Sequence, residues 1–197
     1  PLGHGFAMSV GMAIAEEMLA AKYNKNGFKV VDHYTYGICS DGDLMEGVAS
    51  EAASLAGTLA LGKLILLYDD NKITIEGSTD IAFREDVGAR FTAYGWQVLR
   101  VDDAEDIDGI TAAVKEAKAE KNRPSLVMVR THIGCGSPKQ DCASAHGEPL
   151  GAEALAKTKE DGGWPIGNSF YIPESVKAYF EKKLPSCAEK QKDWQSL

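Results

Sequence analysis

The chain has 197 residues, the length of one globular domain with a short extension. Apolar residues make up 44% and charged residues 25%, as in ordinary soluble domains, which excludes a disordered or fibrous chain. Lysine and arginine number 21 against 29 aspartate and glutamate residues, and the net charge of −8 argues against non-specific binding to nucleic acid or to an anionic membrane. Any phosphate group that the protein binds must therefore be held by local chemistry.

The spacing of apolar residues predicts alternating helices and strands over the first two thirds of the chain. In chain order, we predict a helix at 6–23, a strand at 34–39, a helix at 45–61, a strand at 63–68, a helix at 82–94, a strand at 96–101, a helix at 107–120 and a strand at 125–131. Such alternation implies right-handed crossovers and a sheet covered on both faces. We therefore predict a three-layer α/β/α fold with a mostly parallel sheet, which binds ligands beyond the carboxyl ends of its strands.

The last third of the sequence has a different character. Residues 134–151 form a loop rich in Gly and Ser, and residues 173–183 read as an amphipathic helix with a proline near its start. Residues 186–197 are charged and have few apolar side chains, so we expect either a linker or a helix that packs on another part of a larger protein. We assign residues 1–165 to the main domain and residues 166–197 to a linker or helix that leads towards a second domain.

The cysteines and the apolar runs bear on the location of the protein. Cys39, Cys135, Cys142 and Cys187 show neither a C-x-x-C pair nor a spacing typical of zinc, so we interpret them as reduced thiols. The longest apolar run, 64–68, is much shorter than the roughly 20 residues that cross a bilayer, and no export signal is visible. We expect a cytoplasmic protein.

Two clusters of turn-forming residues follow neighbouring predicted strands. One is Ser-Asp-Gly-Asp at 40–43 and the other is Asp-Asp-Asn-Lys-Ile at 69–73. If the strands are adjacent, Asp41 and Asn71 converge. One carboxylate, one amide oxygen and one backbone carbonyl form part of a hard, oxygen-only shell, which suits Mg²⁺ or Ca²⁺ completed by phosphate oxygens and water.

The first of these clusters also suits a diphosphate. Gly42 lets the backbone approach a ligand closely, and the helix that follows offers free N–H groups to an anion. On local spacing alone, an equally good interpretation is that Asp, Gly and Asn serve here only as turn and cap residues.

Three other motif readings are weaker. Residues 57–64 nearly match the P-loop motif, but Leu64 stands where the motif has a hydroxyl that binds Mg²⁺. The segment also precedes a strand, whereas a P-loop follows one, so we reject this interpretation. Residues 3–8 resemble a dinucleotide-binding turn, but Met8 replaces the third glycine, although the two glycines remain candidates for ligand contact. The Asp-Gly-Asp triplet at 41–43 is also compatible with the nucleophile loop of a Mg²⁺-dependent phosphohydrolase, which needs a downstream lysine and acidic pair that we do not find.

Among the histidines, His146 is the most informative. It lies in a loop after the last predicted strand, at the same edge of the sheet as the candidate metal site, where its ring could contact a phosphate or exchange a proton near neutral pH. The alternative is an exposed histidine without a role. His4 lies beside the glycines at 3–5 and could also reach a ligand, whereas we interpret His33 and His132 as structural.

Taken together, these segments resemble the thiamine-diphosphate-binding domain of transketolase. The matching stretches are PLGHG at 1–5, DHYTY at 32–36, DG and EG at 41–42 and 46–47, LAG at 55–57, YDDNKITI at 68–75, YGW at 94–96, IGCGS at 133–137 and HGEPL at 146–150. Their order and spacing hold from the first residue to about Trp164. The resemblance implies the thiamine-diphosphate-binding fold, thiamine diphosphate and Mg²⁺ or Ca²⁺ as cofactors, and a homodimer with its cofactors at the subunit interface.

The resemblance also implies a role for each matching residue. The metal ligands are the Asp41 and Asn71 side chains and the Ile73 carbonyl, while Gly42 contacts the diphosphate through its backbone. Further cofactor contacts or supports are, by the same resemblance, Leu2 and Ile75 at the thiazolium ring, Gly3 beside them, Asp69 behind Asn71, and His146 at the diphosphate. Catalytic roles fall to His146, at the reacting end of the sugar, and to Glu46, in a carboxylate network between subunits.

The implied activity is the transfer of a two-carbon ketol unit from a ketose phosphate to an aldose phosphate, as in the pentose phosphate pathway. Ser40 departs from the family, which usually has Gly there, and Gln is common where His4 stands. The family's subunits are several times longer, and its remaining active-site groups lie outside these 197 residues. We therefore expect a fragment that is inactive by itself. Alternatives are a split subunit, a non-catalytic thiamine-diphosphate-binding module, or another thiamine enzyme such as a related synthase or dehydrogenase component.

Overall fold

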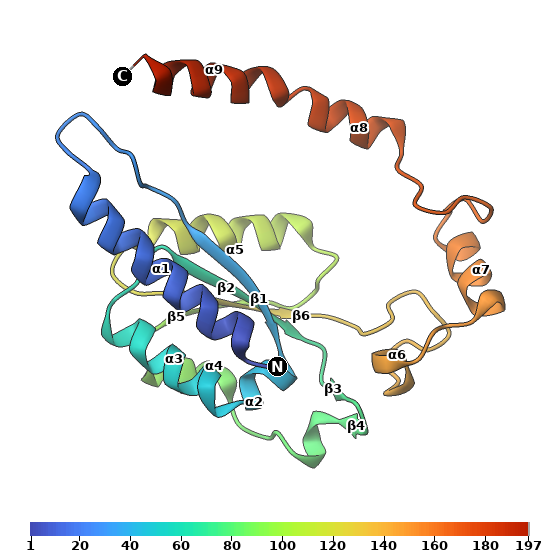
Figure 1. The fold of residues 1–197 in the computed structure, drawn as a ribbon. Helices are drawn as coiled ribbons and strands as arrows, with labels where there is room; N and C mark the ends of the chain where they lie inside the picture. Colours follow the sequence, from blue (N-terminus) through green and yellow to red (C-terminus); the bar gives the residue numbers. More distant parts are fainter. Residues whose placement is uncertain (197) are drawn as a thin grey trace. The chain divides into compact units, whose positions relative to one another are not determined.

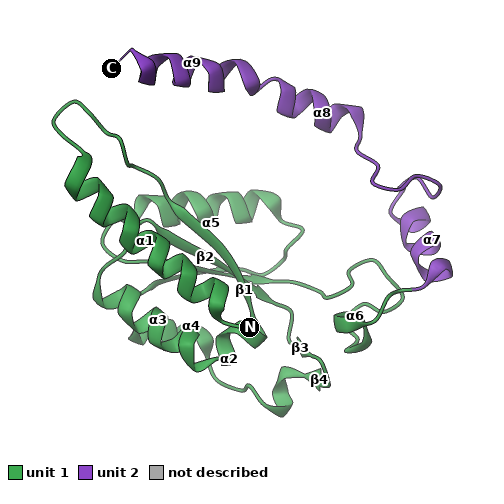
Figure 2. Cartoon of the chain, viewed as in Figure 1, with its two compact units in different colours: residues 1–150 green, residues 151–197 purple. Residues whose placement is uncertain are grey.

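The computed structural model describes residues 1–196. Contacts between Cα atoms divide the chain into one unit at 1–150 and another at 151–197, which are described separately (Figure 2). None of the helices in the described part combines the length and the apolar character that a membrane crossing needs.

A parallel four-stranded sheet forms the centre of the first unit, with the strand order β1-β2-β6-β5 (Figure 1). The strands of this sheet are β1 (Thr35–Ser40), β2 (Leu64–Asp70), β5 (Gln97–Val101) and β6 (Ser125–Arg130). A short antiparallel hairpin, β3 (Ile73–Thr74) and β4 (Gly77–Ser78), follows β2. The helical elements of the unit are α1 (His4–Tyr23), α2 (Asp41–Met45), α3 (Gly47–Thr58), the 3-10 turn η1 (Thr79–Ile81), α4 (Val87–Ala93), α5 (Ile107–Ala119) and α6 (Ser144–Gly147).

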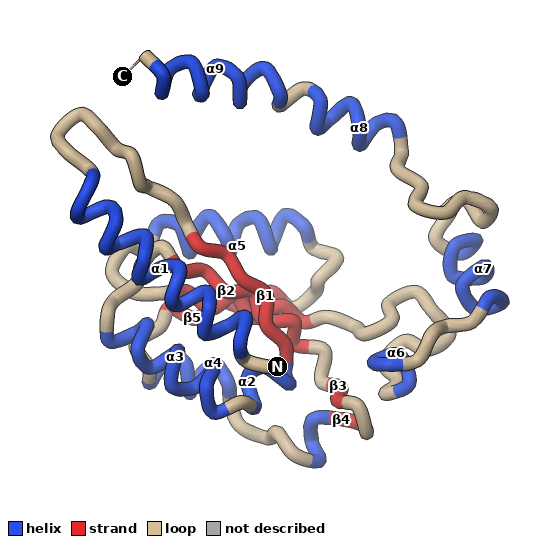
Figure 3. Tube along the Cα trace, in the orientation of Figure 1, coloured by secondary structure: helices blue, strands red, loops and turns tan. Residues whose placement is uncertain are grey.

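Helices cover both faces of the sheet, because alternate residues of the central strands point to opposite sides. On one face, Leu64, Leu66 and Tyr68 of β2 join a buried cluster with side chains of α1, α3 and α4. On the other face, Ile65 and Val127 pack with side chains of α5. Figure 3 shows the strands between these two layers of helices. The predicted α/β/α fold with a parallel sheet is confirmed.

Two predicted helices differ from the structure, and local caps explain both differences. The predicted helix at 45–61 is α3 at Gly47–Thr58, and most of the turn predicted at 40–43 belongs to the short helix α2, because the Ser40 N–H donates to Asp43 Oδ2 over 3.1 Å. The predicted helix at 82–94 starts only at Val87, because the Asp86 side chain caps it by accepting from the Ala89 N–H at 2.9 Å.

The second unit consists of helices without a core of their own. They are α7 (Ala152–Asp161), α8 (Glu174–Glu181) and α9 (Leu184–Gln195). Between residues 151 and 196 no side chain is buried, and Phe170 is fully exposed. The helix predicted at 173–183 is confirmed, and the predicted tail at 186–197 is largely helical, although its last residue lies outside the described residues.

Candidate functional site at the carboxyl ends of the strands

The register of β1 and β2 sets the geometry of the site. Ser40 pairs with Asp69, so both strands end at the same level of the sheet. The two turn clusters predicted from the sequence therefore leave the same edge of the sheet, on adjacent strands.

Asp41 lies at the centre of this edge and is only 2% exposed. Its Oδ1 accepts a hydrogen bond from the Tyr68 hydroxyl, and its Oδ2 accepts from the Lys72 N–H at 3.2 Å. Burial raises the pKa of Asp41 above its ordinary value, although the hydrogen bond from Tyr68 opposes this rise. Lys72 stands between Asn71 and Ile73, so this hydrogen bond joins Asp41 to the turn that carries Asn71, while the convergence of Asp41 and Asn71 on one ligand stays a prediction.

The turn after β2 is held by its own side chains. Asn71 Oδ1 accepts from the Ile73 N–H at 2.9 Å, and Asn71 Nδ2 lies 3.4 Å from Asp69 Oδ1. The Thr131 hydroxyl, just after β6, donates to the same Asp69 oxygen. Lys72 adopts a left-handed backbone conformation with φ 64°, which turns the chain sharply. Asp69, at the end of β2, thus contacts Asn71 in the turn that follows.

The start of α1 lies at the same edge of the sheet, against α2. The Gly3 N–H donates to Asp43 Oδ1 at 2.9 Å, which ties α1 to α2. Gly3 has φ 75°, and a Cβ there would lie 2.9 Å from Glu46 Cβ, so the position favours glycine. A Cβ on Gly42 would meet Leu2 at 3.3 Å, which puts Leu2 beside the glycine predicted to contact a diphosphate.

The remaining predicted residues lie at the rim. Glu46 is exposed at the junction of α2 and α3, and Ile75 is 70% exposed in the β3–β4 turn. His146 lies on α6, a four-residue helix within the predicted loop at 134–151, and its ring is exposed and makes no hydrogen bond to the described residues. In Figure 1, α6 lies beyond the carboxyl ends of the strands, on the same side of the sheet as the hairpin.

The donor set fits a hard divalent cation. Each oxygen of Asp41 accepts one hydrogen bond and so keeps a further lone pair, as does Asn71 Oδ1. Among residues 1–196 no three His, Cys, Asp or Glu side chains gather as a metal site. A shell with one carboxylate, one amide and one backbone carbonyl agrees with this, because the missing ligands would come from the bound diphosphate and water.

Sequence reasoning missed the residues that support the site. Tyr68 stands out in the sequence only as part of a longer motif, and nothing in the sequence singles out Thr131. Their contacts with Asp41 and Asp69 depend on strand order and register, which local sequence does not reveal. The Asp43 carboxylate, part of the triplet that is compatible with a phosphohydrolase loop, is occupied by the Gly3 and Ser40 N–H groups.

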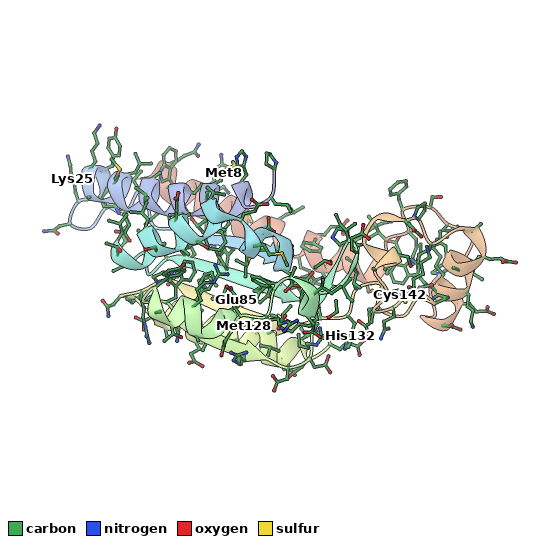
Figure 4. All side chains as sticks on the ribbon, turned by 90° about the horizontal axis from the view of Figure 1, so that it is seen from below. Met8, Lys25, Glu85, Met128, His132 and Cys142 are labelled. Carbon is green, nitrogen blue, oxygen red and sulfur yellow. The ribbon has the colours of Figure 1, made fainter. Side chains whose placement is uncertain are left out.

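His132 and the cysteines form no hydrogen bond to the predicted ligand residues in the described part of the chain, although Cys39 lies next to the site on β1. His132, shown beyond Met128 of β6 in Figure 4, has Nδ1 2.9 Å from Asp141 Oδ2, which agrees with a structural role. Cys39 is buried and unpaired, and burial raises the pKa of its thiol. The other cysteines are exposed and also free of disulfides.

The chain is similar to known proteins over its whole length. The family model described as "Transketolase, thiamine diphosphate binding domain" matches residues 1–197. A transketolase from Halalkalibacterium halodurans is 54% identical over 198 residues, which is 100% of this chain and 30% of that protein.

Solved structures give the same result. Transketolase from Leishmania mexicana superposes with a TM-score of 0.95 at 45% identity and covers 100% of this chain and 29% of its own. A transketolase complex with sedoheptulose 7-phosphate from Pichia stipitis has a TM-score of 0.95 at 46% identity, with the same coverage. The chain thus spans about 30% of the length of these relatives. It belongs to the transketolase family, as a thiamine-diphosphate-binding domain.

Proposed function

We propose that this chain supplies the diphosphate and metal site of a transketolase, which transfers a two-carbon ketol unit from a ketose phosphate to an aldose phosphate. The observation that carries the proposal is the hydrogen bond from the Lys72 N–H to the buried Asp41 carboxylate. It joins the two turns that hold the predicted ligands, so that they face one another across adjacent strands.

Asp41 and Asn71 would hold the cation through their side chains, and Ile73 through its carbonyl. Mg²⁺ is the natural occupant, because it prefers oxygen ligands and completes its shell with phosphate oxygens and water. Ca²⁺ accepts the same oxygens with looser geometry. The Asp69 side chain would keep Asn71 in place through its contact with Asn71 Nδ2.

The residues at the edge of the site would position the rest of the cofactor. Gly42 lets the backbone meet the diphosphate, and Leu2 and Ile75 offer exposed apolar surface to a ring. Gly3 holds α1 close to α2, which keeps Leu2 there. Bound thiamine diphosphate would supply the nucleophilic carbon and the electron sink of the reaction.

His146 and Glu46 would act beside the cofactor. An exposed histidine beyond the strand ends can donate a hydrogen bond to a phosphate or move a proton at the sugar oxygen, because imidazole side chains exchange protons near neutral pH. Glu46, exposed at the junction of α2 and α3, would join a carboxylate network with a second copy of the protein. The sugar phosphates, the homodimer and a cytoplasmic location belong to this proposal. The exposed free cysteines favour a reducing compartment.

Calorimetric titration tests the metal site directly. Thiamine diphosphate is titrated into the whole protein that contains this chain, with and without Mg²⁺, for the wild type and for Asp41→Ala. We expect binding to require Mg²⁺ and Asp41→Ala to weaken it at least tenfold, about 1.4 kcal/mol, because one hard ligand is lost.

The matched control is Asp108→Ala, which removes an exposed aspartate at the start of α5 and should leave the affinity unchanged. Equal affinity for thiamine diphosphate in the wild type and in Asp41→Ala, with and without Mg²⁺, would contradict the proposed metal site.

A further inference from the structure

Tyr68 is a buried side chain of β2 whose hydroxyl contacts the proposed metal ligand Asp41. It lies near the carboxyl end of β2, pairs with Cys39 of β1, and is 1% exposed. Its hydroxyl donates to Asp41 Oδ1. The ring belongs to the buried cluster beneath α1 and α3, so the hydroxyl is held by packing as well as by its hydrogen bond.

The Asp41 carboxylate is therefore fixed from two sides. The Tyr68 hydroxyl contacts Oδ1, and the Lys72 N–H contacts Oδ2 at 3.2 Å. Two donors on two different oxygens restrict rotation of the carboxylate about its Cβ–Cγ bond and determine which lone pairs point outward. One donor belongs to the backbone, but the other is a side-chain hydroxyl that a single substitution removes.

A second carboxylate, that of Asp70, lies near the Tyr68 hydroxyl but has a cationic partner of its own. Asp70 is also buried close to the Tyr68 hydroxyl, but Lys72 Nζ lies 2.6 Å from Asp70 Oδ1 and balances its charge. Asp41 forms no ion pair among the described residues, although the charge of Lys72 also favours its ionised form, so the Tyr68 hydroxyl is the side chain that donates a hydrogen bond to it.

We propose that Tyr68 is a positioning residue that fixes the orientation of Asp41 and thereby favours a cation with strict geometry over one with loose geometry. The proposal rests on the proposed function, because it takes Asp41 as a ligand. Mg²⁺ requires near-octahedral geometry at short distances, whereas Ca²⁺ accepts variable coordination by mobile carboxylates. A carboxylate released from its hydroxyl partner therefore loses more affinity for Mg²⁺ than for Ca²⁺. Groups behind metal ligands commonly alter affinity by roughly 10- to 100-fold.

The test compares cation affinities in Tyr68→Phe and in the wild type, using the whole protein. Mg²⁺ and Ca²⁺ are each titrated calorimetrically at saturating thiamine diphosphate. We expect Tyr68→Phe to weaken Mg²⁺ binding about tenfold and Ca²⁺ binding less than about threefold. An unchanged ratio of the two dissociation constants would overturn the proposal.

A control separates positioning from general stability. Trp96→Phe also removes a buried aromatic donor, since Trp96 Nε1 donates to the Ala53 carbonyl at 2.9 Å on the same face of the sheet. It should lower the melting temperature and leave both cation affinities unchanged. If Trp96→Phe shifts the ratio as Tyr68→Phe does, the effect is global and the proposal fails. If Asp41→Ala keeps full Mg²⁺ affinity, the proposed metal site itself is wrong, which is a different outcome from an unchanged ratio in Tyr68→Phe.

Fluorine NMR tests the proposal without removing the Tyr68 hydroxyl, in case Tyr68→Phe does not fold. The ring of Tyr68 is labelled with fluorine by incorporation of 3-fluorotyrosine. The resonance of residue 68 should shift when Mg²⁺ is added with thiamine diphosphate, and by a different amount with Ca²⁺. A resonance that responds to neither ion, or identically to both, would contradict the proposal.

Discussion

Replacing Lys63 by methionine should destabilise the protein, because it leaves a buried charge without its partner. Glu16 of α1 is 1% exposed, and its Oε1 lies 2.7 Å from Lys63 Nζ. Lys63 Nζ also lies 2.8 Å from Asp32 Oδ1. Burial alone would lower the pKa of Lys63, but its hydrogen bonds to Asp32 and Glu16 outweigh burial and raise that pKa above its ordinary value. The stabilisation from this pairing is therefore fully present at neutral pH and is lost only in strong alkali.

The expected loss follows from the burial of Glu16. Removing one partner of a buried ion pair costs about 3–5 kcal/mol, and we expect the lower end because the Lys63 side chain is 25% exposed. For a domain of this size, about 3 kcal/mol corresponds to a fall in melting temperature of about 6–12 °C.

Thermal and urea denaturation of three variants provide the assay. Lys63→Met should show the full loss, and the double variant Glu16→Gln/Lys63→Met should recover most of it, because no buried charge remains. Lys29→Met is the matched control, since it removes only the exposed pair with Asp32 at 3.3 Å and should change stability by less than about 0.5 kcal/mol. A Lys63→Met loss as small as that of Lys29→Met would refute the reasoning.

Three further outcomes are expected. Asp41→Asn should abolish metal-dependent cofactor binding without lowering the melting temperature of the metal-free protein at pH 7. The reason is that the pKa of Asp41 is raised in the folded protein, so its ionised form lowers stability above that pKa. This loss of stability disappears as the pH falls towards 3.8, the ordinary pKa of the group. His146→Ala should lower turnover of the whole enzyme at least about tenfold while the melting temperature stays within a few degrees, since its ring is exposed; a large fall in melting temperature with full turnover would mean a structural role. Gly57→Ala should cost about 3 kcal/mol or more in urea denaturation, because its Cβ would lie 1.7 Å from the Tyr94 carbonyl oxygen; a neutral result would contradict this packing.

The fold was largely predictable because its strongest signals are local. The run at 63–68 is apolar on both faces, and the strand β2 in its place is buried from both sides. The helix predicted at 107–120 differs from α5 by one residue at its end. The predictions failed where short polar side chains cap helices, as at Asp43 and Asp86, because such hydrogen bonds set where a helix begins.

The position of the two turns that carry the candidate residues was predictable, but the side chains that support these turns were not. Asp41 and Asn71 stand out as turn residues after apolar strands, and the sheet brings their turns together. The roles of Tyr68 and Thr131 required the pairing of β2 with β1 and with β6, which joins residues 27 and 62 positions apart. Such long-range partners leave no periodic signal in the sequence.

Anomalous diffraction from crystals of the whole protein grown with Mn²⁺ and thiamine diphosphate would test the central claim most directly. Mn²⁺ takes the same oxygen ligands as Mg²⁺ and can be located by its anomalous signal. The proposal predicts a peak about 2.0–2.4 Å from an Asp41 carboxylate oxygen, Asn71 Oδ1 and the Ile73 carbonyl oxygen, bridging to the diphosphate. A peak coordinated by other residues, or a bound diphosphate without a cation at this edge of the sheet, would contradict it.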